Sequence, residues 1–245
     1  MNIPTRQILS KLSLAALIAI ATLGTACKKN EPVKPENELE HKHHEEPTKI
    51  VISLTEATLA EGKNFAFANL ASISDKAPVN KQSFTYEQKA DGSWGYAGST
   101  QPQFTVKTIT QSPQTVYRLE LNYYAPDGDD MNGEFIEEGQ DRLHQHFLCY
   151  YKGTQKRQTS NLPYEYIYAD LDEKGQLLAE QNPIGLRGYV RFRELTSPLE
   201  LRMELFHASI SKYVPGTTAH PFYHPSAELV NTSELDASIP LVFRP

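Results

Sequence analysis

Residues 49–55 read Lys-Ile-Val-Ile-Ser-Leu-Thr, and this run sets the character of most of the chain. It is rich in branched apolar residues, and apolar and polar side chains alternate toward its end, which is typical of a β-strand. Runs of the same kind recur at residues 83–88, 103–110, 115–123, 144–152, 164–170, 186–194, 199–208 and 239–243. The sequence therefore predicts a domain built mainly from short strands.

Turn signals separate these runs. Glycine or proline occurs in each of the connecting segments at residues 90–93, 126–128, 152–153, 173–175 and 197–198. Helical periodicity is weak, although residues 55–70 predict a short helix. Regularly spaced strands without intervening helices predict an all-β fold. We expect a single antiparallel β-sandwich, or a partly open barrel, over residues 49–245.

Residues 1–26 have the features of a secretory signal peptide. Basic residues at Arg6 and Lys11 precede an apolar run at 12–23. This run is about a dozen residues long, which fits a signal core of roughly 7–15 residues and falls short of the roughly 20 that span a membrane. Small residues follow and lead to Cys27. We expect lipid attachment at Cys27, and the alternative is an ordinary secretory signal cleaved after Ala26.

The chain has only two cysteines, Cys27 and Cys149. If Cys27 carries lipid, Cys149 has no partner for an intramolecular disulfide. Cys149 lies in an aromatic run at residues 147–151, where a buried, inert thiol is the simpler interpretation.

A charged, proline-containing stretch at residues 27–48 follows the signal. It has almost no apolar side chains, so we predict a disordered tether between the lipid and the domain. His41, His43 and His44 lie there beside two glutamates, and imidazole with carboxylate suits zinc or copper. The tract therefore predicts a loose metal-binding segment, and the alternative is a merely solvated linker.

A second histidine cluster begins the predicted strand at 144–152. On a strand His144 and His146 point to the same face, roughly 6.6 Å apart along the chain. Two imidazoles on one face can chelate one ion, and Glu138 or Asp141 from the preceding loop can add an acidic ligand. The alternative is that these are surface polar residues on a solvated face of the sheet.

Two further segments have residues that bind metals in other proteins. His220, Tyr223 and His224 lie in a long stretch without strand pattern, and such loops are often functional. The acidic segment at 127–134 suggests calcium but departs from the EF-hand spacing. For both segments a structural loop is the simpler interpretation.

The chain resembles small envelope lipoproteins of the Bacteroidetes type over roughly residues 120–210. The resemblance lies in three segments, Glu137-Glu138 with Leu143-His144-Gln145-His146-Phe147, then Asn182-Pro183-Ile184-Gly185-Leu186, then Leu201-Arg202 with His207. Leu143 replaces an acid of that pattern, and His146 replaces an aromatic residue. The resemblance implies an outer-membrane location and a link to metal or nutrient uptake. It extends to His144, Gln145 and His207, and we add His207 to the expected metal site.

The remaining features narrow the choice of function. The net charge is −6 and no basic patch stands out, so we expect no nucleic-acid partner. The sequence has no recognisable catalytic motif, and we expect no enzyme. The leading hypothesis is a lipid-anchored outer-membrane protein that binds zinc, copper or a metal complex and delivers it to an outer-membrane transporter. The alternatives are a structural or adhesin-like lipoprotein without a metal site, and a haem- or carbohydrate-binding lipoprotein that uses Trp94, Tyr96 and the aromatic loop.

Overall fold

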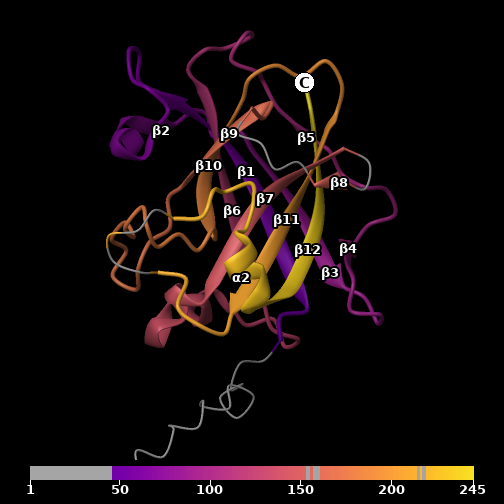
Figure 1. Ribbon diagram of the computed structural model, residues 1–245. Helices are drawn as coiled ribbons and strands as arrows, with labels where there is room; N and C mark the ends of the chain where they lie inside the picture. The colour runs from indigo at the N-terminus through magenta and orange to yellow at the C-terminus, as the bar shows by residue number, and fades with distance from the viewer. Residues whose placement is uncertain (1–45, 153–154, 157–160, 214–215, 217–218) are drawn as a thin grey trace, which may run out of the picture. The chain divides into compact units, whose positions relative to one another are not determined.

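Two β-sheets account for most of the structure (Figure 1). The computed structural model describes residues 46–152, 155–156, 161–213, 216 and 219–245. The predicted signal peptide, Cys27 and the three tether histidines lie outside the described residues. In the part of the chain that is described, no helix is both long and apolar enough to cross a membrane.

The larger sheet has the strand order β4-β3-β1-β6-β10-β9, and β2 pairs with β1 beside this path. All of these pairings are antiparallel. Its strands are β1 (Lys49–Leu59), β2 (Ile73–Asp75), β3 (Lys81–Gln88), β4 (Trp94–Tyr96), β6 (Thr115–Tyr124), β9 (Tyr164–Tyr168) and β10 (Arg187–Phe192).

The smaller sheet has the order β5-β12-β11-β7-β8, and only the short contact between β5 and β12 is parallel. Its strands are β5 (Phe104–Thr105), β7 (His144–Lys152), β8 (Gln155–Lys156), β11 (Leu199–Ala208) and β12 (Ser233–Arg244). The short helices are the 3-10 helices η2 (Phe67–Ser72), η3 (Asn132–Phe135) and η4 (Glu137–Arg142), and the α-helix α2 (Ala227–Asn231).

Alternate side chains of the strands point inward and form the main core. Ile50, Ile52 and Leu54 of β1 are fully buried, and they belong to the same cluster as Leu201 and Ile239 of the smaller sheet. A separate cluster on the outer side of the smaller sheet contains Phe147, Cys149, Phe206, Ala208 and Leu229. Helix α2 therefore covers that outer side through Leu229, and Cys149 is buried as expected.

The structure confirms a mostly-β architecture of two sheets, one of which curves as a half-barrel. The expected helix at residues 55–70 is wrong for the first part of this range, because β1 continues to Leu59 and only η2 is helical nearby. The expected strand at 103–110 shortens to β5. Strands β2 and β4 and helix α2 were not expected, because each is too short to show a period.

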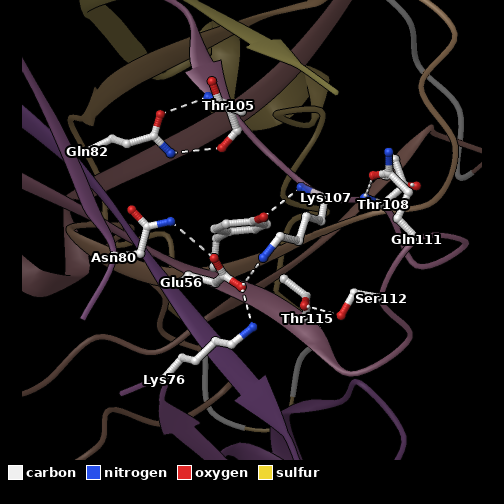
Figure 2. Close-up of polar contacts among 11 residues, drawn as sticks. Glu56, Lys76, Asn80, Gln82, Thr105, Lys107, Thr108, Gln111, Ser112 and Thr115 are labelled. Carbon is white, nitrogen blue, oxygen red and sulfur yellow. Dashed lines mark hydrogen bonds and ion pairs between the residues drawn. The ribbon is translucent and has the colours of Figure 1, made fainter. Parts of the chain in front are cut away.

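A buried carboxylate ties β1 to two neighbouring segments. Figure 2 shows Lys76, Asn80 and Lys107 converging on Glu56, which is only 3% exposed. The Nζ atoms of Lys76 and Lys107 lie 2.9 Å and 2.8 Å from Glu56 Oε1. Burial by itself raises the pKa of Glu56, but the hydrogen bonds from Lys107, Lys76 and Asn80 outweigh it and lower the pKa to about 2. The cluster therefore holds a charged carboxylate inside the sheet.

Candidate metal centre

Two histidines from neighbouring strands lie side by side at the start of β7. His144 of β7 and His207 of β11 are direct partners in the antiparallel register. Their ring centroids are 4.4 Å apart, with 27° between the ring planes. The adjacent pair is joined by a hydrogen bond from Ala208 N to Leu143 O, so His144 and His207 form a non-hydrogen-bonded pair. Side chains approach most closely in such pairs, which explains the contact.

A bulge in β12 adds a carboxylate to this pair. The register between β11 and β12 shifts between Leu205, which faces Ala237, and Phe206, which faces Leu235. Asp236 is the extra residue, and a bulge re-aims the side chain at such a position. Its Oδ2 lies 3.9 Å from His207 Nδ1. One potential ligand atom from each of His144, His207 and Asp236 lies within 4.8 Å of the others.

This spacing is close to that of a metal site. A tetrahedral ion with ligands at ~2.0–2.2 Å holds the ligand atoms roughly 3.3–3.6 Å apart. Side-chain movements on the order of 1 Å would therefore bring the three groups around one ion. Two imidazoles with one carboxylate form a set that suits zinc or copper.

The environment of the three side chains favours an ion at the boundary with solvent. His144 is 7% exposed, and the side chains of His207 and Asp236 are 30% and 37% exposed. His144 Nδ1 lies 3.1 Å from Gln140 O, which favours the tautomer that has its proton on Nδ1 and its lone pair on Nε2. A backbone carbonyl of this kind typically orients a metal-binding imidazole.

His146 points to the same face of β7 as His144, as expected, but its ring lies in a different environment from that of His144. Its Nε2 lies 2.6 Å from Tyr123 Oη, and its Nδ1 lies 2.9 Å from Ile184 O. Burial lowers the pKa of His146 to about 4, although the contact with Ile184 O acts in the opposite direction. Both ring nitrogens have protein partners. In this structure His146 is a hydrogen-bonded core residue, and His207 takes the place beside His144 that the sequence assigned to it.

The two expected acidic ligands lie elsewhere. Glu138 is an exposed residue of η4 with a positive φ of 53°. The carboxylate of Asp141 accepts a hydrogen bond from Asn182, and Lys212 Nζ donates to Asp141 O at 2.7 Å and to Asn182 Oδ1 at 2.9 Å. Burial lowers the pKa of Lys212 to about 8. Asp141 therefore connects loops, and neither acid belongs to the group of His144.

The other predicted segments have structural contacts. In the acidic segment, Asp127 Oδ1 accepts from Asp129 N, and Asp130 Oδ1 accepts from Asn132 N, so these carboxylates stabilise turns. His220 lines a cavity of about 620 Å³. Trp94 is buried in the main core, where it is 8% exposed.

Sequence reasoning did not find Asp236. If β12 alternated regularly, Ala237 and Ile239 would face the core and Leu235 would follow them. In the structure Leu235 is 53% exposed, because the bulge breaks the alternation. Nothing in the residue types around Asp236 indicates a bulge.

The comparisons give no family assignment: no protein-family model, no curated protein and no solved structure matches this chain.

Proposed function

We propose that this chain is a lipid-anchored envelope protein that binds a transition-metal ion, zinc or copper, through His144, His207 and Asp236. The observation that carries the proposal is the convergence of three potential ligand atoms from three strands within 4.8 Å. The site lies at the boundary with solvent, which suits exchange of the ion with a partner. Delivery to an outer-membrane transporter is the role that we infer.

The N-terminal segment supports the location in this proposal. A short apolar run ending in small residues and Cys27 is typical of a lipoprotein signal. The tether histidines His41, His43 and His44 would raise the local concentration of metal ions near the domain. The main site would be the tighter of the two, because paired strands hold its ligands in place.

Metal titration of the purified full-length chain, made without a histidine tag, tests the proposal. We expect a tight phase of one zinc or copper ion per chain and a weaker phase. His207→Ala and Asp236→Asn should each weaken the tight phase at least tenfold, and deletion of residues 41–46 should remove only the weak phase. His220→Ala is the matched control, because it removes a histidine outside the group and should leave both phases unchanged.

The pH dependence gives a second measurement. Imidazoles bind metal only when they are neutral, so the affinity of the tight phase should fall in acid. A titration without a tight phase, or one in which His207→Ala behaves like the parent, contradicts the metal site. That result would favour a structural or interaction role.

A further inference from the structure

Strand β9 forms an open edge of the larger sheet. Among the described strands it pairs only with β10. Ala169 N donates to Arg187 O at 2.9 Å, and Arg193 N donates to Pro163 O at 2.8 Å. These two bonds show that the odd-numbered residues of this segment direct their main-chain groups toward β10.

The even-numbered residues therefore direct theirs outward. The N–H and C=O groups of Tyr164, Tyr166 and Tyr168 face away from β10, and within the described chain no main-chain hydrogen bond takes them up. A strand edge of this kind is a template for another strand.

The cavity of about 620 Å³ runs along this edge. Tyr166, Ile167 and Tyr168 all line it. Successive side chains of a strand point to opposite faces, so three consecutive residues share one cavity only where it follows the edge of the strand. The strand edge is the floor of this groove.

Two apolar walls flank the floor. Phe67 of η2 forms one wall, and Phe222 forms the other. The ring of Phe222 packs against Tyr166, with 5.7 Å between the centroids, so this wall rises on the inner side of β9. Neighbouring residues of the η2 wall, Phe65 and Leu70, pack on the opposite side, against the cluster that contains Ala169 and Tyr189.

We propose that this groove binds an extended peptide segment of a partner protein, which adds to β9 as a further strand. The outward main-chain groups would pair with the main chain of the peptide, and alternate apolar side chains of the peptide would contact Phe67 and Phe222. The walls select a single strand over a second copy of this chain, because a folded copy would bring its own walls against them. This groove is separate from the candidate metal centre of His144, His207 and Asp236, and binding there does not depend on metal.

A displayed library of random hexapeptides, panned on the purified full-length chain, supplies the probe. We expect binders with alternating apolar residues. Ala66→Trp, which fills the groove, should weaken the best binder at least tenfold. Ala68→Trp is the matched control, because Ala68 is exposed and does not line the groove, and it should bind like the parent.

Alternate N-methylation of the synthetic peptide tests strand addition itself. In an added strand every second amide of the peptide faces β9, and the others face away from it. Methyl groups on the amides that face β9 should abolish binding, and methyl groups on the alternate amides should be tolerated. The proposal is overturned if panning yields no binder, if Ala66→Trp leaves the affinity unchanged, or if the two alternately methylated peptides bind equally.

Discussion

His144 and His146 are two residues apart and point to the same side of β7, but the residues around them give them different chemistry. His146 is 1% exposed and lies between the Tyr123 hydroxyl and the Ile184 carbonyl. Its lowered pKa of about 4 keeps the ring neutral at neutral pH. His144 stacks on His207 at the rim. Neighbouring positions on one face of β7 therefore hold a core histidine and a candidate ligand.

The stability of the protein should fall in mild acid because of His146. Its pKa is about 4 when folded and 6.5 in the unfolded chain, so only the unfolded state gains a proton between these values. The contribution is fully present above pH 6.5 and is lost toward pH 4, by about 3 kcal/mol. Chemical denaturation from pH 7 to pH 4.5 measures this slope. His146→Gln should flatten it, and an equally steep slope in that variant would refute the assignment.

Glu56 should cause a second loss of folding stability at lower pH. Its pKa falls from 4.5 in the unfolded chain to about 2 in the folded protein, so its stabilisation is present above pH 4.5 and disappears as the pH approaches 2. The partner lysines are 44% and 49% exposed, and screening reduces the contribution to about 2 kcal/mol. In denaturation measurements between pH 5 and pH 2.5, the stability of Glu56→Gln should not show this fall. Glu61→Gln, at an exposed position, should keep it.

At the scale of elements, the loop at residues 182–186 fixes the start of β7. Asp170 accepts hydrogen bonds from the N–H groups of Ile184, Gly185 and Arg187. Ile184 O accepts from His146 N at 2.6 Å as well as contacting the His146 ring. This loop therefore has a packing role that is visible in the structure.

Gly185 is the position in this loop where a side chain should be least tolerated. Its φ is +90°, and an added Cβ would lie 2.7 Å from His146 Cβ and 3.2 Å from His146 O. We expect Gly185→Ala to cost about 3 kcal/mol of unfolding free energy, from backbone strain together with the clash. Gly128→Ala is the control, because φ is +98° but nothing lies within 4 Å, and strain alone should cost about 1 kcal/mol. Equal losses in urea denaturation would show that the contact with His146 does not matter.

Strand periodicity explains how much of these elements the sequence could predict. Strand β11 at Leu199–Ala208 has the predicted limits, because its apolar residues alternate with polar ones from Leu199 to Leu205 and an apolar pair, Phe206 and Ala208, follows on the other face. The histidine pairing across β7 and β11 follows from the register, which single-strand patterns do not contain. The bulge at Asp236 and the partners of His146 depend on contacts between distant segments. The sequence could therefore place His144 and His207 on strands, but it could not show that Asp236 joins them.

At the scale of the whole molecule, the open edge of β9 contrasts with the covered edge of β7. Leu148 N donates to Phe222 O at 2.8 Å, and His146 O accepts from the Tyr168 hydroxyl at 2.6 Å. Side chains and loops thus satisfy main-chain groups along β7, whereas the groove between Phe67 and Phe222 follows the edge of β9 that has outward-facing groups. An edge that is both open and flanked by aromatic walls is typical of a binding surface rather than of an edge protected against aggregation.

The location of the whole chain should depend on Cys27. One acyl chain holds a protein to a membrane only marginally, and stable anchoring needs more than one chain, as a lipidated N-terminal cysteine supplies. We expect the full-length protein to sediment with membranes after a high-salt wash, and Cys27→Ser to move to the soluble fraction. Cys149→Ser is the matched control and should stay with the membranes, because that thiol is buried within the domain. A Cys27→Ser variant that remains membrane-bound after washing would mean that another part of the chain holds the protein there.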